Sequence, residues 1–173
     1  MPAILFVCTA NQFRSPIAAA CFSRKLASLQ WKGDWIIQSA GTWTSAGAPA
    51  LPVAIIAARK IGVSLEGHKA RSVTPELIST QNLILVMESG QKEALQSEFS
   101  IFSKRVFLLS EVALGLVEEI ADPVMSDTDS YVEAAIKINA MVERGFYRIC
   151  GRALKTSIIQ IPPTTFDASS VSP

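Results

Sequence analysis

A cysteine, an arginine and a serine follow a short apolar segment near the N-terminus. Residues 3–7 (A-I-L-F-V) are typical of a buried strand, Cys8 follows directly, and Arg14 and Ser15 come after five intervening residues. A cysteine thiolate is a strong nucleophile. An arginine presents five N–H donors in a planar fork suited to phosphate. The two side chains could therefore bind and attack one tetrahedral oxyanion.

A helix is expected to begin directly behind these residues. Serine is a preferred N-cap and proline fits the first helical position, so Ser15 and Pro16 predict a helix start. The unpaired N–H groups and the dipole of a helix N-terminus favour anions, and the same field favours a thiolate over a thiol. An isolated pair at this spacing also arises by chance, with a buried strand cysteine and a surface arginine. The predicted strands and helices around the two residues decide between an anion-binding site and a chance spacing.

Strand-like and helix-like segments alternate along the chain. Apolar runs between turn residues predict strands, and apolar residues spaced by threes and fours predict helices. Further strands are expected at 35–39, 82–87 and 105–109, and helices at 16–29, 52–61, 90–99 and from a capping box of Ser130 and Glu133 to about 149.

Four strands alternating with helices predict an α/β fold, a three-layer sandwich in which a four-stranded parallel sheet carries helices on both faces. In such sheets, ligands bind beyond the carboxyl ends of the strands. Cys8, Ser39 and the segment after Met87 all fall at such ends. The expected fold thus places the loop between Cys8 and Arg14 where a ligand would bind, which argues against a chance spacing.

The composition is that of one compact domain. The chain has 173 residues, of which 49% are hydrophobic and 18% charged, and its net charge is +1 without a basic run. This balance argues against a nucleic-acid surface. Three cysteines and one histidine suggest neither a disulfide framework nor a metal site, so reduced thiols and a cytoplasmic location are expected. We expect no membrane segment, a domain over 1–152, and a tail containing Ser, Thr and Pro over 153–173.

Residues 7–16 (V-C-T-A-N-Q-F-R-S-P) resemble the signature loop of the low-molecular-weight protein tyrosine phosphatases, in their bacterial form. The likeness continues, in order and spacing, at 39–42 (S-A-G-T), 67–71 (G-H-K-A-R), 82–88 (N-L-I-L-V-M-E) and 122–123 (D-P). It covers residues 3 to about 150 and implies the phosphotyrosine phosphatase I fold, a flavodoxin-like arrangement.

The resemblance implies hydrolysis of protein phosphotyrosine through a phosphocysteine, with no metal and no other cofactor. Cys8 would be the nucleophile, Arg14 would bind the phosphoryl oxygens, and Asp122 would be the general acid and then the general base. Nearby carboxylates at Glu118, Glu119, Asp127 and Asp129 leave the choice of acid open, because Asp-Pro is also a common turn. The phosphate-binding loop would comprise Thr9, Ala10, Asn11, Gln12, Phe13 and Ser15.

The resemblance also implies a supporting network. An asparagine of the loop, here Asn11, would adopt a left-handed backbone held by Ser15, Ser39 and His68. Asparagine tolerates positive φ better than most residues. His68 alone could equally be an ordinary loop histidine.

The sequence departs from the family pattern at several positions. Ala10 stands where glycine is usual, Gln12 where an apolar residue is usual, and Phe13 where a second cysteine is usual. Phe13 puts a bulky ring in a tight loop. No aromatic pair follows Asp122-Pro123, which leaves Trp43 as the candidate aromatic wall for a phosphotyrosine ring, or as a plain exposed loop residue.

Two other functions compete with the phosphatase hypothesis. A non-catalytic module could keep the loop and only bind phosphoproteins or an inorganic anion. An arsenate reductase would need relay cysteines after the third strand, where this sequence has none. The expected partners are a phosphotyrosine protein, for which a bacterial tyrosine kinase is a candidate, and inorganic phosphate or sulfate; nucleic acid and membrane are not expected, and the chain would be a monomer or a weak dimer.

Overall fold

Four parallel strands form the centre of the molecule. The computed structural model describes residues 1–31, 33–123 and 127–159. The strands are β1 (Ala3–Cys8), β2 (Ile36–Gly41), β3 (Leu83–Val86) and β4 (Val106–Leu108), in the order β2-β1-β3-β4. Cys8 pairs in register with Gly41, and Val7 with Val86, so the carboxyl ends of β1, β2 and β3 meet at one edge. The predicted parallel sheet is confirmed.

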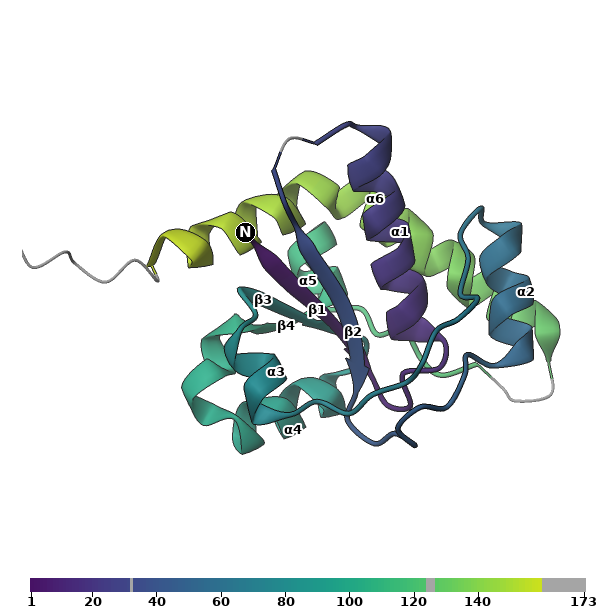
Figure 1. The fold of residues 1–173 in the computed structure, drawn as a ribbon, viewed down its shortest axis with the longest axis horizontal. Helices are drawn as coiled ribbons and strands as arrows, with labels where there is room; N and C mark the ends of the chain where they lie inside the picture. The colour runs from purple at the N-terminus through teal and green to yellow at the C-terminus, as the bar shows by residue number, and fades with distance from the viewer. Residues whose placement is uncertain (32, 124–126, 160–173) are drawn as a thin grey trace, which may run out of the picture.

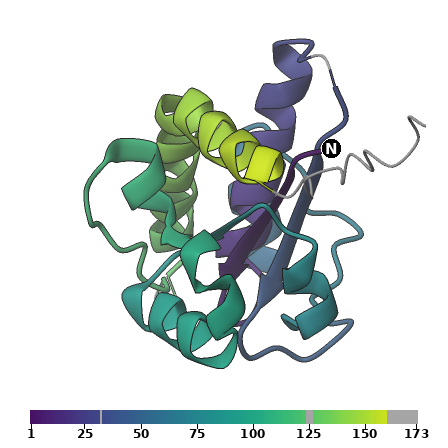
Figure 2. The same ribbon diagram turned by 90° about the vertical axis from the view of Figure 1, so that its left-hand side faces the viewer.

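Helices cover both faces of this sheet (Figure 1). On one face lie α1 (Arg14–Ser28), α2 (Pro52–Lys60), α5 (Leu109–Leu114) and α6 (Thr128–Ile159). On the other lie α3 (Pro75–Ser79), α4 (Ser89–Glu98) and the 3-10 helix η1 (Ser100–Arg105). Figure 2 shows the same separation from the side, with the green-to-yellow α6 on one side of the sheet and α3 and α4 on the other.

Alternate side chains of β1 explain the three layers. Ile4, Phe6 and Cys8 belong to the core shared with α1, α2, α5 and α6. Leu5 and Val7 belong to a second core, shared with α3 and α4. All six residues of β1 are buried, as expected for a strand covered on both faces, and its end therefore has a fixed position.

Two predicted helix starts are wrong. α1 begins at Arg14 with Phe13 at the N-cap, so Ser15 lies inside the first turn and its hydroxyl contacts Cys8 and Asn11 instead of capping. α6 begins at Thr128, two residues before the expected capping box. The Asp127 carboxylate accepts the Asp129 N–H at 3.0 Å, and the Ser130 hydroxyl donates to the Asp127 carbonyl, so Ser130 does not cap.

Three short helices, α3, α5 and η1, were not expected, because segments of five or six residues show little periodicity. α6 continues to Ile159, so the boundary expected at 152 falls inside this helix. Residues 160–173, most of the expected tail, lie outside the described residues, as does the segment after Asp122-Pro123. In the described part of the chain, no helix combines the length and apolar character needed to cross a bilayer.

Candidate active site

The loop between β1 and α1 brings the nucleophile candidate next to a hydroxyl. Cys8 is the last residue of β1, and Ser15 lies in the first turn of α1. The Cys8 Sγ atom is 3.1 Å from the Ser15 Oγ atom, and both residues are buried. A thiolate at Cys8 would accept a hydrogen bond from this hydroxyl. The first N–H groups of α1 have no carbonyl partner within the helix, so they can donate to an anion held by the loop.

Asn11 holds the loop in shape. Its φ is +55°, and its Nδ2 donates to Ser15 Oγ and Ser39 Oγ, both at 2.9 Å. Its Oδ1 accepts the Arg71 N–H at 3.0 Å, and its carbonyl accepts from the His68 Nε2–H at 2.6 Å. The structure therefore brings together the four side chains that the sequence had grouped, and adds the Arg71 backbone, which the sequence did not reveal.

Gly41 allows the next strand to approach the loop. The N–H groups of Thr42 and Trp43 donate to the carbonyls of Cys8 and Thr9, each at 3.0 Å. A Cβ atom at Gly41 would collide with the Thr9 carbonyl oxygen and with the Thr44 side chain. The S-A-G-T segment thus needs its glycine because two backbones pass each other there.

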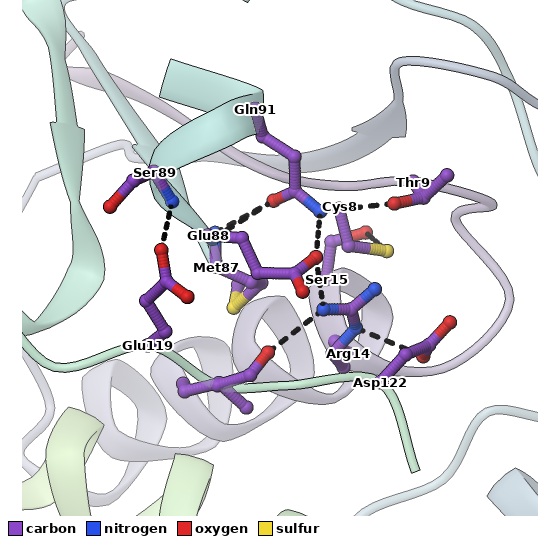
Figure 3. Close-up of polar contacts among 11 residues, drawn as sticks. Cys8, Thr9, Arg14, Ser15, Met87, Glu88, Ser89, Gln91, Glu119 and Asp122 are labelled. Carbon is purple, nitrogen blue, oxygen red and sulfur yellow. Dashed lines mark hydrogen bonds and ion pairs between the residues drawn. The ribbon is translucent and has the colours of Figure 1, made fainter. Parts of the chain in front are cut away.

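Arg14 is fixed by acceptors on three sides. Its Nη1 donates to Glu88 Oε2 at 2.7 Å and to the Ile120 carbonyl at 2.8 Å, and its Nε lies 3.1 Å from Asp122 Oδ1 (Figure 3). Only 2% of the side chain is exposed. Glu88 and the Ile120 carbonyl therefore fix the orientation of this buried guanidinium beside the loop.

Gln91 connects this arginine to the loop. Its Nε2 donates to Glu88 Oε2 at 2.8 Å and to Thr9 Oγ1 at 3.1 Å, and its Oε1 accepts the backbone N–H groups of Met87 and Glu88 (Figure 3). Glu88 and Gln91 were not predicted as site residues from the sequence. The available signal was a carboxylate two residues after the end of β3, with a glutamine three residues later, at the start of α4.

Asp122 is the carboxylate that reaches the loop. Its neighbour Ile120 is anchored by an N–H bond to the Met87 carbonyl, at 2.9 Å. The other carboxylates of this region have different partners: Glu119 accepts the Ser89 N–H at 2.8 Å, and Glu118 pairs with Lys137 at 2.7 Å. The Asp122 side chain is 65% exposed, so its carboxylate borders both the cavity and the solvent.

A partly open cavity of about 120 Å³ lies over Cys8. Its wall is formed by Cys8, Ala10, Gln12, Phe13, Arg14, Leu51, Asp122 and Tyr131. Leu51 and Tyr131 were not predicted as site residues. Leu51 is the N-cap of α2 and Tyr131 lies in α6, and both are far from the loop in the sequence. The three residues that the resemblance assigned to nucleophile, phosphate binding and acid thus surround one space.

Phe13 is compatible with the tight loop because its ring points out of the loop and into the core. The ring packs edge-on against Tyr131, with centroids 4.8 Å apart, and the residue is buried in the core. Ala10 is also accommodated, because its φ is negative and the position therefore does not require glycine. Within the described chain, the non-glycine residues with positive φ are Asn11 and Gln30. Gln12 donates from Nε2 to the Pro49 carbonyl at 2.9 Å. These departures therefore leave the loop shape intact.

Trp43 lies beside the loop but not in the cavity wall. Its side chain is 84% exposed, and its contact with the loop is the backbone bond to Thr9. Its role as an aromatic wall stays a prediction. The aromatic rings that do line the cavity belong to Phe13 and Tyr131.

The fold and the loop define a small phosphatase of the α/β class. Residues 3–155 match the family described as low molecular weight phosphotyrosine protein phosphatase, and the chain belongs to this family. It is 33% identical over 142 residues to the probable low molecular weight protein-tyrosine-phosphatase EpsP of Ralstonia nicotianae, covering 82% of this chain and 89% of the relative.

Solved structures agree with this assignment. The YwlE arginine phosphatase from Geobacillus stearothermophilus has a TM-score of 0.79 and 28% identity, covering 90% of this chain and 97% of the other. The tyrosine phosphatase Wzb from Escherichia coli K30, solved in complex with sulphate, has a TM-score of 0.75 and 27% identity, covering 86% and 98%. The family and the fold predicted from the sequence are both confirmed.

Inorganic phosphate should stabilise the protein by binding the native loop. At about 100 times its dissociation constant, a ligand of the native state adds roughly 2.7 kcal/mol to the free energy of unfolding, or roughly 5–10 °C in melting temperature for a chain of this size. Thermal unfolding with and without phosphate measures this shift.

Two arginine variants test whether the loop causes the shift. Arg14→Ala should abolish it. Arg144→Ala, which changes an exposed arginine of α6, should retain it. An unchanged melting curve of the wild type would show that the loop does not bind phosphate.

Peroxide should inactivate the protein without forming an internal disulfide. Cys21 lies in α1 and Cys150 in α6, both buried, and burial raises the pKa of the Cys21 thiol to about 11 and that of Cys150 to about 12. Neither thiol is therefore a ready partner for an oxidised Cys8, and Phe13 replaces the usual one.

Mass spectrometry after brief peroxide treatment checks this expectation. Wild type should carry oxidised Cys8, and Phe13→Cys should give a disulfide that thiol reagents reverse. A bridge from Cys8 to Cys21 or Cys150 would contradict the expectation and revive a redox function.

Proposed function

We propose that the protein hydrolyses phosphotyrosine in proteins, with Cys8, Arg14 and Asp122 as its catalytic residues. The observation that carries the proposal is the single cavity in which all three residues meet, with Arg14 held by Glu88 and by the Ile120 carbonyl. The family of the chain supports the same activity.

The first half-reaction breaks the ester bond. The Cys8 thiolate attacks phosphorus in line with the leaving oxygen, a P–S bond forms, and the P–O bond breaks. Asp122 delivers the proton that the departing phenolic oxygen takes up. The Arg14 guanidinium and the N–H groups of the loop hold the three other phosphoryl oxygens and stabilise their charge in the transition state.

The second half-reaction frees the enzyme. Asp122, now a carboxylate, takes a proton from water as the water oxygen attacks phosphorus, and the P–S bond breaks to release inorganic phosphate. The hydroxyl of Ser15, 3.1 Å from Cys8 Sγ, donates to the departing sulfur and favours its release as a thiolate. Asn11 and its partners keep the loop in the conformation that both steps require.

A second substrate class, phosphoarginine, is favoured by Gln12. This residue lines the cavity, and its Nε2 is bound to the Pro49 carbonyl, which leaves Oε1 as the acceptor toward a ligand. A guanidinium group offers N–H donors to Gln12 and Asp122, whereas a tyrosine ring offers none. The similar YwlE structure is described as an arginine phosphatase.

Turnover of p-nitrophenyl phosphate, a phosphotyrosine peptide, a phosphoarginine peptide and a phosphoserine peptide tests the proposal. We expect phosphotyrosine to be hydrolysed with the highest kcat/KM, and phosphoserine to be poor because its alcohol is a worse leaving group. Preference for phosphoarginine would favour the second class. Phosphate binding without turnover of any substrate would favour the non-catalytic binding module. A disulfide-relay reductase is disfavoured because Cys21 and Cys150 are buried in helices.

The cellular setting is also a proposal. A nucleophilic cysteine has to stay reduced, and the three cysteines are free thiols, which suits the cytoplasm. A bacterial tyrosine kinase or its phosphorylated target would be a fitting partner for such an activity. Among the described residues, no three His, Cys, Asp or Glu side chains gather as a metal site, and the mechanism above needs none.

A further inference from the structure

A second and larger cleft, of about 640 Å³, lies between β4, α5 and the C-terminal half of α6. An adjoining cleft of about 550 Å³ extends it toward α4 and η1, and the two share Phe107 and Arg152. We call the combined feature the distal groove. It shares no lining residue with the cavity over Cys8.

The distal groove lies away from the catalytic loop. In both ribbon views, the yellow end of α6 lies near the N-terminus of the chain, where β1 begins (Figures 1 and 2). Cys8 is at the opposite, carboxyl end of β1. A molecule in the groove would therefore leave the active site open.

The groove offers apolar surface to a ligand. Phe107 and Val112 are half-buried, whereas Leu116 and Val117 beyond the end of α5 are exposed, Val117 to 69%. Large apolar side chains that gather at the rim of a cleft are typical of binding sites. The groove can thus receive an apolar side chain of a partner.

The same groove concentrates positive charge. Its walls carry five cations against the single carboxylate of Glu111, which gives a local net charge of +4 in a chain whose net charge is +1. The rest of the protein is therefore negative overall. The five cations are Lys92, Lys104, Arg148, Arg152 and Lys155.

Most of these cations are available to a ligand. Lys92 pairs with Glu111 at 2.8 Å, and the Arg152 guanidinium lies 4.2 Å from the centre of the Phe107 ring. Over the residues that the structure describes, Lys104, Arg148 and Lys155 form no ion pair. The partner must therefore supply the negative charge that this surface lacks.

We propose that the distal groove docks an acidic peptide segment of a partner protein, one that carries an apolar side chain among its carboxylates. The apolar side chain would pack against Leu116 and Val117, and the carboxylates would pair with Arg148 and Lys155. The hollow shape suits a projecting side chain better than a flat membrane surface. The one aromatic ring of the groove, Phe107, already stacks with the Arg152 guanidinium, so the groove offers no row of aromatic rings on which nucleic-acid bases could stack.

Fluorescence anisotropy with a labelled peptide tests the proposal directly. The probe is a decapeptide of glutamates with one leucine and one phenylalanine at its centre. We expect the double variant Arg148→Glu, Lys155→Glu to weaken binding by tenfold or more, because each reversal turns an attraction into a repulsion. A probe with serines in place of leucine and phenylalanine should also bind more weakly.

The matched control is Arg144→Glu, one turn before Arg148 on α6, exposed and outside the groove. It makes the same change of charge as Arg148→Glu alone, which should itself weaken binding several-fold, whereas Arg144→Glu should alter the affinity less than twofold. Hydrolysis of p-nitrophenyl phosphate should be the same in all these proteins, which shows that the variants are folded. Because binding is measured without turnover, failure of this proposal is distinguishable from failure of the proposed catalytic function.

Several results would overturn the proposal. Equal loss of affinity in Arg144→Glu would show a diffuse attraction instead of a groove. Equal binding of the serine-substituted probe would show that the groove has no subsite for an apolar side chain. Tighter binding of an oligonucleotide or of phosphatidylglycerol vesicles, or a dimer lost in the double variant, would assign the surface to a different occupant.

Discussion

Replacing Cys8 by serine should lower kcat for p-nitrophenyl phosphate by about 10⁴-fold or more, as expected when a covalent nucleophile is removed. A serine hydroxyl is a far weaker nucleophile than a thiolate at neutral pH, and no described base lies ready to activate it. Phosphate binding should persist, because Arg14 and the loop N–H groups remain. Steady-state turnover and the melting shift with phosphate measure the two effects separately.

Cys150→Ala is the matched control for this variant. It also removes a buried thiol, but from α6, away from the cavity. Its kcat per folded molecule should stay within a few-fold of wild type. Substantial turnover by Cys8→Ser would show that another group attacks phosphorus, and the mechanism proposed above would be wrong.

Replacing Asp122 by alanine should have the second-largest effect, and its size should depend on the leaving group. Loss of a general acid typically costs about 10²–10⁴-fold, and we expect this range for a phosphotyrosine peptide. p-Nitrophenolate leaves readily without a proton, so its release should suffer less. Comparison of the kcat/KM values of both substrates in wild type and variant measures the difference.

Asp127→Ala and Asp129→Ala are the controls for Asp122. Both residues lie near the start of α6, outside the cavity wall, and Asp127 accepts the Asp129 N–H. Neither variant should show a loss that depends on the leaving group. If one of them did, and Asp122→Ala did not, the acid would be assigned to the wrong residue.

The sheet and the loop could be predicted because their signals are local. The apolar runs of β1 and β3 are covered on both faces, and such runs stand out in the sequence. The loop residues Cys8 and Arg14 are also close together in the chain. Once the sheet placed Cys8 at a carboxyl edge, the position of the site followed.

The helix starts were mispredicted because one side chain can serve two purposes. The Ser15 hydroxyl could cap a helix, yet in the structure it contacts Cys8 and Asn11. A capping rule uses only the residues around the helix start, so it does not include a contact with Cys8 at the end of β1. Phe13 is the converse case: a bulky ring is unexpected in a tight loop, but this ring packs in the core against Tyr131.

The rest of the site could not be predicted because it is assembled from distant segments. Glu88 and Gln91 reach Arg14 and Thr9 from the start of α4, more than 70 residues along the chain. Tyr131 and Leu51 complete the cavity from two other helical regions. Their side chains have ordinary core or surface patterns in the sequence, so only the fold reveals their place.

Trapping a covalent intermediate would show directly whether Cys8 attacks phosphorus. Asp122→Ala, mixed briefly with p-nitrophenyl phosphate and quenched in acid, should accumulate a phosphoenzyme, because the variant lacks the base that activates water. Peptide mass spectrometry should find one phosphoryl group on the peptide that contains Cys8, and none on that peptide in the Cys8→Ala, Asp122→Ala double variant, whose alanine offers no nucleophile. Continued p-nitrophenol release by the double variant, or a phosphoryl group on another residue, would contradict the account.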